Sequence, residues 1–212
     1  MKLYGKLLSR TPRCMWALGE MNVDYEHIPT DHRAGETHVP EFLKINPNGK
    51  IPVLVDGDFV LTESMAINLY LAQKYNKLWP SDLISQTRIN EWSYWGMTEV
   101  ELPMLTIVRE TFFKPAGEVR PEVIKEATEE LNRFLKVLDS HLDGRDYLVG
   151  DNFSIGDLNV ASILKFCLFF QFDFSAHPNV KRWLDDVWSR PVAKKLCDEM
   201  IAGAKAMAAA AQ

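Results

Sequence analysis

Residues 46–54 have the sequence NPNGKIPVL, and residues 61–64 have the sequence LTES. The first segment begins with a turn, because Asn-Pro and Asn-Gly pairs are typical of turns. Pro52 follows at the start of a β-branched run, a place where a strand tolerates a residue without an N–H. Asp56-Gly57 can then supply the positive φ angles of a two-residue hairpin. We therefore expect a turn, a hairpin and, at Glu63-Ser64, the start of a helix whose free N–H groups can bind an anion.

Short strands and helices alternate around this segment. Strands are expected at residues 2–7 and 25–28. Thr11 is expected to N-cap a helix that has Pro12 at its first position, where the missing N–H costs nothing, and a short helix opens at Pro40. The order over residues 1–76 is then β-α-β-α-β-β-α, which is typical of a thioredoxin-like α/β domain.

The second part of the chain has helical patterns throughout. Turn-forming residues place a linker at residues 77–84. Residues 85–212 lack strand patterns, and their apolar residues recur at helical spacing. The alanine-rich tail at residues 202–212 fits the end of a helix. The predicted fold is an α/β thioredoxin-like N-terminal domain over residues 1–76, followed by an all-α C-terminal domain.

A helix expected at residues 86–113 carries aromatic residues on more than one side. Trp92, Tyr94 and Trp95 cannot share one face at 100° per residue. We therefore expect this helix to contact the core, a partner subunit and an open apolar pocket.

Residues 153–158, with the sequence FSIGDL, predict the start of a buried helix. Ser154 and Asp157 have the spacing of a capping box, and Phe153 and Leu158 have that of a hydrophobic staple. We expect the carboxylate of Asp157 to cap the helix rather than to take part in catalysis.

The composition of the 212-residue chain excludes several functions. Its 47% hydrophobic and 25% charged residues are ordinary for a soluble globular protein, and a net charge of −5 argues against a nucleic-acid partner. Cys14, Cys167 and Cys197 lack metal-type spacing, so we expect no metal and a reduced, cytoplasmic setting. No run approaches the roughly 18 apolar residues of a membrane span, and the first residues lack the apolar stretch of a secretory signal.

The segment at residues 46–64 resembles the glutathione-binding half of soluble glutathione S-transferases, which have the pattern N-P-x-G-[KQ]-[IV]-P-x-L followed by [ED]-S. The box at residues 154–157 resembles the S/T-x-x-D box of the same family. The resemblance covers essentially the full chain. It implies a cis bond between Ile51 and Pro52, and a serine-type protein similar to the theta and delta classes or to a related bacterial class.

The resemblance also implies how glutathione is held. Glu63 would pair with the amine of the γ-glutamyl group, and Ser64 would bind its carboxylate through the hydroxyl and the N–H at the helix start. The backbone of Val53, or of Ile51 in the other register, would bond the cysteinyl peptide. Pro52 would turn these backbone groups outward.

Two residues are candidates for the glycine carboxylate of glutathione. Lys50 is well placed in the motif to pair with it. His38 lies one residue after the place at which delta-type proteins have a histidine, and a plain surface histidine is the alternative interpretation.

The candidate that activates the sulfur is Ser9, in a segment SRTPR that resembles the S-x-x-x-R segment of serine-type members. In those proteins the hydroxyl donates a hydrogen bond to the glutathione sulfur and favours the thiolate. Thr11 is the rival donor, and Tyr4, inside the first strand, ranks below Ser9. Cys14 falls on the apolar side of the helix pattern, so we expect an inert, buried thiol.

The sequence therefore predicts an enzyme, a glutathione transferase that activates the thiol of its co-substrate glutathione for attack on a hydrophobic electrophile. A glutathione-dependent isomerase, dehalogenase or ether-cleaving lyase is the alternative, and a non-catalytic binding or regulatory protein is a further one. The resemblance implies a cytoplasmic homodimer with a role in detoxification. Neither nucleic acid nor a membrane is expected as a partner.

Overall fold

The computed structural model describes the backbone of residues 1–210, and the side chains of these residues except Ala116 and residues 207–210. By packing, the chain forms two compact units, one that joins Met1–Trp79 to the segment beginning at Pro191, and one that spans Pro80–Arg190. The last helix groups with the first unit by packing, whereas the sequence assigned it to a domain over residues 85–212. The domain limits expected from the sequence stay a prediction.

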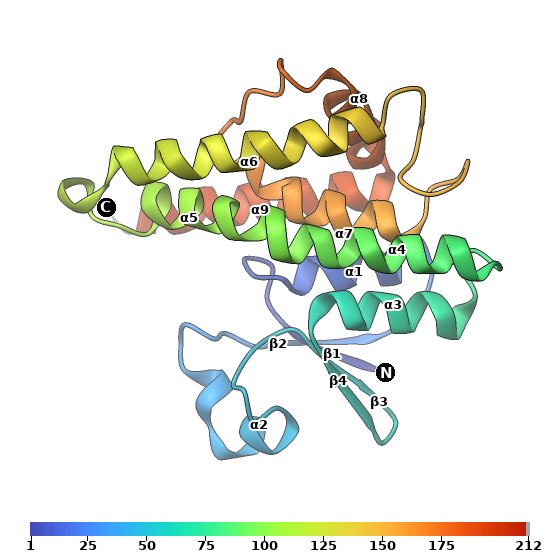
Figure 1. Cartoon of the computed structure of the whole chain (residues 1–212). Helices are drawn as coiled ribbons and strands as arrows, with labels where there is room; N and C mark the ends of the chain where they lie inside the picture. The colour runs from blue at the N-terminus through green and yellow to red at the C-terminus, as the bar shows by residue number, and fades with distance from the viewer. Residues whose placement is uncertain (211–212) are drawn as a thin grey trace. The chain divides into compact units, whose positions relative to one another are not determined.

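Within the residues that the structure describes, four short strands form one mixed sheet in the first unit (Figure 1). They are β1 (Lys2–Gly5), β2 (Glu26–Pro29), β3 (Val53–Asp56) and β4 (Phe59–Thr62). The order across the sheet is β2-β1-β3-β4; β1 runs parallel to β2 and antiparallel to β3, and β3 runs antiparallel to β4. This topology confirms the thioredoxin-like domain.

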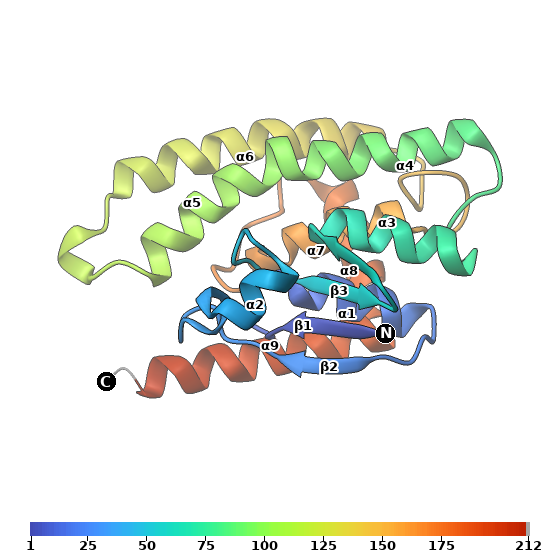
Figure 2. The ribbon, with the colours of Figure 1, turned by 90° about the horizontal axis from the view of Figure 1, so that it is seen from below.

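Helices pack on both faces of this sheet. Figure 1 shows α1 (Thr11–Glu20) and α3 (Ser64–Tyr75) on one face and α2 (Pro40–Ile45) on the other. The helix α9 (Pro191–Ala210), drawn in red in Figure 2, packs against α1. The last two residues of the helical tail expected at 202–212 lie outside the described residues.

The segment at residues 46–64 folds as expected. The peptide bond between Ile51 and Pro52 is cis. The turn between β3 and β4 has Gly57 at a φ of 62°, the left-handed conformation that glycine adopts without strain. Asp56 pairs with Phe59 across this turn. The hairpin is therefore confirmed.

The start of α1 differs from the prediction. Thr11 is the first residue of the helix, and Arg10 takes the N-cap position with helical backbone angles. The N–H of Thr11 donates to Ser9 Oγ at 3.0 Å. The prediction that Thr11 caps the helix is wrong, because its side chain packs against Gly5 and Ser9 accepts the N–H at this end.

The second unit is helical in the part of the chain that the structure describes, which confirms the all-α prediction. Its α-helices are α4 (Leu83–Trp95), α5 (Glu101–Phe112), α6 (Pro121–His141), α7 (Ile155–Leu164) and α8 (Pro178–Ser189). Three short helices join them, η2 (Gly96–Val100), η3 (Ala116–Glu118) and η4 (Lys165–Leu168). In Figure 1, α6 lies beside α5, against which it packs. No described helix combines the length and apolar character needed to cross a membrane.

The helix expected at residues 86–113 is interrupted by η2, which is a π-helical turn. Pro103 lacks the N–H that would bond to the carbonyl of Glu99, and its ring would crowd that carbonyl. Both effects favour a widened helical turn just before Pro103. Gly96 permits a close approach to α7, since a Cβ atom there would lie 2.7 Å from Ile163 Cδ1.

The aromatic residues of α4 differ in their surroundings, whereas the expected contacts with a partner subunit and an open apolar pocket stay a prediction. Trp92 is buried and packs against Trp95, with ring centroids 5.0 Å apart, whereas Tyr94 is exposed.

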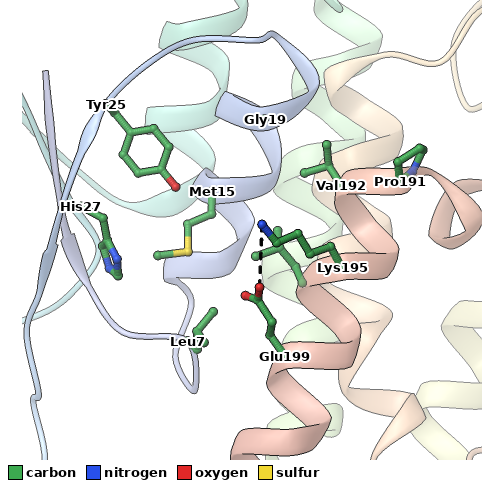
Figure 3. A pocket seen from close by; sticks show the side chains of 10 residues that line it. Leu7, Met15, Gly19, Tyr25, His27, Pro191, Val192, Lys195 and Glu199 are labelled. Carbon is green, nitrogen blue, oxygen red and sulfur yellow. Dashed lines mark ion pairs between the residues drawn. The ribbon is translucent and has the colours of Figure 1, made fainter.

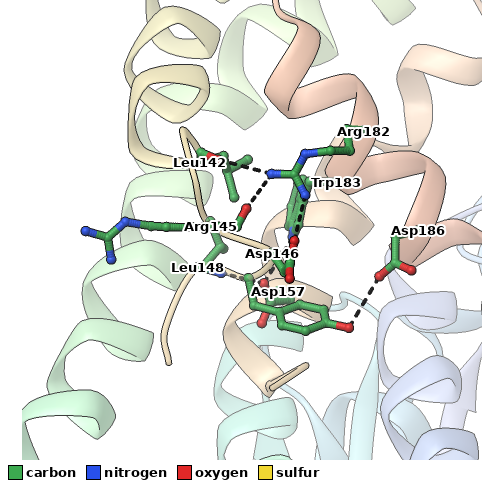
Figure 4. A network of polar contacts seen from close by, with 9 residues as sticks. Leu142, Arg145, Asp146, Leu148, Asp157, Arg182, Trp183 and Asp186 are labelled. Atoms are coloured by element: carbon green, nitrogen blue, oxygen red, sulfur yellow. Dashed lines mark hydrogen bonds and ion pairs between the residues drawn. The ribbon is translucent and has the colours of Figure 1, made fainter. Parts of the chain in front are cut away.

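The box at residues 154–157 caps α7, as predicted. Figure 4 shows Asp157 beside Leu148 and Trp183. Asp157 Oδ2 accepts hydrogen bonds from the N–H and the hydroxyl of Ser154, and Oδ1 accepts from the N–H of Leu148 and from Trp183 Nε1. Burial raises the pKa of Asp157, and these hydrogen bonds act in the opposite direction. The carboxylate therefore connects the start of α7 to α8 and to the preceding loop.

Candidate active site

Ser9 lies half-buried in the loop between β1 and α1. Its Oγ is 2.6 Å from the carbonyl oxygen of Lys6 and 2.9 Å from Thr11 Oγ1, and it accepts the N–H of Thr11 at 3.0 Å. That N–H belongs to the first turn of α1, where the helix dipole places partial positive charge. The hydroxyl therefore lies where a negative charge is stabilised.

The other candidate donors are less accessible. Thr11 is fully buried, and its side chain fills the space beside Gly5. Tyr4 is half-buried in β1, and its ring packs edge-to-face against Phe42, with centroids 6.2 Å apart. This geometry favours Ser9 as the donor.

Cys14 has the surroundings of an inert thiol. Its side chain is fully buried, and Sγ lies 3.7 Å from the carbonyl oxygen of Ser64. Burial raises the pKa of the thiol well above its usual range, with a smaller opposing effect from the charge of Arg13. A protonated thiol is a poor nucleophile, so the structure supports the expectation that Cys14 is an inert, buried thiol.

Arg13 has a position that the sequence analysis did not foresee. The guanidinium is buried, and Nη1 lies 3.5 Å from Ser64 Oγ at the start of α3. Asn68 of α3 donates to the Arg13 carbonyl at 3.3 Å. A buried cation beside a helix N-terminus increases the positive potential there. The S-x-x-x-R pattern in the sequence includes Arg13, but it does not indicate that Ser64 is the partner of this arginine.

Asn46 fixes the turn that precedes Pro52. It is buried, its Nδ2 donates to the carbonyl of Lys50 at 2.8 Å, and its Oδ1 accepts the N–H of Asn48 at 3.1 Å. The sequence analysis took the Asn-Pro pair as a turn signal only, and missed this role of the side chain. The side chain of Lys50 itself is exposed.

His38 lies in η1 (Glu36–His38), beside the same turn. Its Nδ1 is 3.1 Å from Thr37 Oγ1, and a Cβ atom at Gly49 would lie 3.1 Å from its Nε2. The imidazole is exposed. His38 and Lys50, the two candidates for the glycine carboxylate, therefore lie close to one glycine.

The two candidates for the peptide contact differ in their backbone pairing. Val53 is paired on both sides, with Tyr4 of β1 and with Thr62 of β4. Ile51 comes before β3, at a bend next to the cis bond. The geometry therefore favours the backbone of Ile51 for a contact with an extended ligand.

Glu63 and Ser64 form the junction between β4 and α3. Glu63 is exposed and has a φ of 68°, a left-handed conformation in which a non-glycine residue is strained by about 1–3 kcal/mol. Such strain gathers at ligand sites. Ser64 is the first residue of α3 and is buried, so the N-terminus of the helix begins directly behind the exposed carboxylate.

A separate pocket of about 530 Å³ lies in the first unit (Figure 3). Side chains from α1, α9 and the region of β2 line it, among them Met15, Tyr25, Val192 and Lys195. Its described lining residues include none of those assigned above to glutathione.

Both parts of the chain match models of one family. Residues 1–73 match the N-terminal domain of glutathione S-transferase, and residues 99–191 match its C-terminal domain. The chain belongs to the glutathione S-transferase family. This glutathione S-transferase is an enzyme with glutathione transferase activity, by its homology to characterised members.

The glutathione S-transferase is similar to plant proteins over nearly its full length. It is 34% identical over 212 residues to glutathione S-transferase 4 of Zea mays, with 97% of this chain and 95% of that protein covered. The structure of glutathione transferase F7 from Populus trichocarpa matches with a TM-score of 0.85 and 30% identity, over 94% of this chain and 98% of that chain. A glutathione S-transferase-I bound with lactoylglutathione matches with a TM-score of 0.85 and 31% identity, over 93% of this chain and 98% of that chain.

Proposed function

We propose that Ser9 activates the glutathione sulfur in this transferase. The observation that carries this proposal is the position of Ser9 Oγ, which is half-buried at the N-terminus of α1 and accepts the N–H of Thr11. Cys14 is buried and Tyr4 packs against α2, so neither competes with it at this end of the helix.

The energy required is within reach of such a site. A cysteine-like thiol has a pKa of about 8.5 and is mostly protonated at neutral pH. Lowering this pKa by about two units takes roughly 2.7 kcal/mol and raises the thiolate fraction at pH 7 from about 3% to about 75%. A charge-assisted hydrogen bond from Ser9 and the dipole of α1 together supply about this much.

The remaining groups of glutathione have partners in the same unit. Glu63 pairs with the γ-glutamyl amine, and the N-terminus of α3 at Ser64, with the guanidinium of Arg13 3.5 Å from the hydroxyl, receives the α-carboxylate. The backbone of Ile51 holds the cysteinyl peptide in preference to that of Val53.

The glycine carboxylate lies near Gly49 in this proposal. Lys50 pairs with it, and the imidazole of His38 adds a second contact from the other side of the turn. Both side chains are exposed, so a ligand can meet them without a rearrangement of the fold.

The proposal also covers the class of the enzyme, its oligomeric state and its location in the cell. The plant proteins named above point to a serine-type enzyme similar to the phi class rather than to the theta and delta classes. We further propose that it works as a cytoplasmic homodimer in detoxification, with a hydrophobic electrophile as second substrate.

Measurement of the reaction stoichiometry tests this function. The purified protein is incubated with glutathione and a chloronitroarene, and loss of free thiol is compared with formation of the thioether. One thiol consumed for each thioether formed supports conjugation. If no chloronitroarene or other hydrophobic electrophile in a panel yields a thioether, or if glutathione is regenerated in every reaction, conjugation is excluded in favour of another glutathione-dependent reaction.

A further inference from the structure

The hydroxyl of Thr11 is fully buried and lies against both Ser9 and Gly5. Its Oγ1 is 2.9 Å from Ser9 Oγ and would lie 1.9 Å from a Cβ atom at Gly5, so the hydroxyl itself fills the space beside this glycine. Gly5 has no Cβ, and one added there would overlap the Thr11 side chain. The absence of this atom fixes the Thr11 hydroxyl next to the residue that we assign to the sulfur.

The protons of these two hydroxyls can be assigned from their partners. A serine hydroxyl has one proton to donate and two positions at which its oxygen accepts. The carbonyl of Lys6, 2.6 Å from Ser9 Oγ, can only accept, so the Ser9 proton is directed to it. The N–H of Thr11 fills one accepting position of Ser9 Oγ at 3.0 Å. Ser9 Oγ and Thr11 Oγ1 are 2.9 Å apart, and because the Ser9 proton is already directed to Lys6, the proton in this contact has to come from the Thr11 hydroxyl, which fills the second accepting position.

We propose that Thr11 is a positioning residue that keeps the Ser9 hydroxyl a hydrogen-bond donor to the glutathione sulfur. With both accepting positions filled by Thr11, Ser9 cannot accept a hydrogen bond from a neutral S–H group. Its single proton turns from the Lys6 carbonyl to the sulfur when glutathione binds, while both bonds from Thr11 persist. A hydrogen bond to the charged form of a group favours that form, so Thr11 acts on the thiol pKa through Ser9.

This inference rests on the role proposed for Ser9. It adds that Ser9 is held as the donor, and not the acceptor, of the hydrogen bond to the sulfur. Without the Thr11 hydroxyl, Ser9 Oγ regains an accepting position and can accept a hydrogen bond from the S–H group of glutathione. This bond favours the neutral thiol over the thiolate. Thr11 then affects the sulfur without touching it. The affinity for glutathione depends on other groups and should change little.

The test compares Thr11→Val, which removes the hydroxyl and keeps the branched shape, with Thr11→Ser, which keeps the hydroxyl. The ultraviolet absorbance of the bound thiolate is titrated against pH, and glutathione affinity is measured by calorimetry. Thr11→Val should raise the pKa of the bound thiol by about half a unit to one unit, which lowers the ratio of thiolate to thiol about threefold to tenfold, the equivalent of one moderate hydrogen bond. Thr11→Ser should retain the wild-type pKa. Thr87→Val, an exposed threonine on α4, is the matched control and should change nothing.

A parallel titration of Ser9→Ala separates the two proposals. If Ser9→Ala raises the thiol pKa but Thr11→Val leaves it unchanged, the inference about Thr11 is overturned and the role of Ser9 stands. If Ser9→Ala leaves the thiol pKa unchanged, the proposed function itself falls. The double variant Ser9→Ala with Thr11→Val should match Ser9→Ala alone, and a further rise would contradict action through Ser9. If Thr11→Val fails to fold, Thr11→Ser and Thr11→Ala repeat the comparison.

Discussion

The side chain of Thr11 occupies the space in which Gly5 would carry a Cβ atom. Gly5 also has a φ of 143°, a conformation that residues with a side chain rarely adopt. We therefore predict that Gly5→Ala destabilises the protein by about 2–6 kcal/mol, because overpacking and backbone strain each cost about 1–3 kcal/mol. Unfolding in urea, followed by circular dichroism, measures this loss.

Gly117→Ala is the control for the glycine substitution. A Cβ at Gly117 meets no atom within 4 Å, and this residue is not at a positive φ. This substitution should change the free energy of unfolding by no more than about 0.5 kcal/mol. A Gly5→Ala variant as stable as the Gly117→Ala variant would show that Thr11 moves aside at no cost.

Glu63 should contribute to glutathione affinity and not to the chemical step. Glu63→Gln removes the charge that we propose to pair with the γ-glutamyl amine, and a hydrogen bond to a charged group is worth about 1.5–3 kcal/mol. We predict that the dissociation constant for glutathione rises about tenfold to hundredfold, with kcat nearly unchanged. Glu41→Gln, an exposed carboxylate on α2, should leave both quantities as they are. A fall in kcat with unchanged affinity would contradict this assignment.

The backbone strain at Glu63 makes a separate prediction. Glycine adopts a φ of 68° without the penalty that alanine pays. Glu63→Gly and Glu63→Ala both lose the carboxylate, but the glycine variant should be more stable by about 1 kcal/mol. Thermal or urea unfolding of the pair measures the difference, and equal stabilities would show that position 63 is not strained.

Glu110 should give the second unit part of its resistance to acid. Hydrogen bonds from Arg120 and Lys114 lower the pKa of this buried carboxyl to about 2. Because the folded pKa is depressed, the stabilisation is fully present above the ordinary value of 4.5 and is lost as the pH falls towards 2. Glu110→Gln should therefore be less stable than wild type at pH 7, and the difference should shrink towards acid.

Unfolding in urea at pH 7 and at pH 3 tests the contribution of Glu110. Glu129→Gln is the matched control, because Glu129 is exposed on α6 and lies 3.8 Å from Lys125. This control should not differ from wild type at either pH. A Glu110→Gln variant whose loss of stability is the same at both values would contradict the ion-pair account.

Local sequence rules were sufficient for the fold of residues 46–64. The Asn-Pro turn, the Asp56-Gly57 hairpin and the helix start at Ser64 depend on residues that are neighbours in the chain, so their conformations could be predicted from type and spacing. The capping box of Ser154 and Asp157 was predictable for the same reason.

The remaining features depend on contacts between distant residues. Thr11 was expected to cap α1, but Gly5, six positions earlier, offers a space that only the folded sheet creates. Arg13 and Ser64 are 51 positions apart, and no local pattern shows that they meet. The π-helical turn at Gly96 likewise reflects close packing against Ile163 as well as the nearby proline.

The pKa of the glutathione thiol bound to wild type and to Ser9→Ala tests the central claim most directly. The account predicts that the bound thiol of wild type titrates about two units below the value of about 8.5 for an unperturbed thiol, and that Ser9→Ala raises it by about one unit or more. The affinity for glutathione should stay within about threefold, because the other contacts remain. A Ser9→Ala variant that binds glutathione with the wild-type thiol pKa would contradict the account.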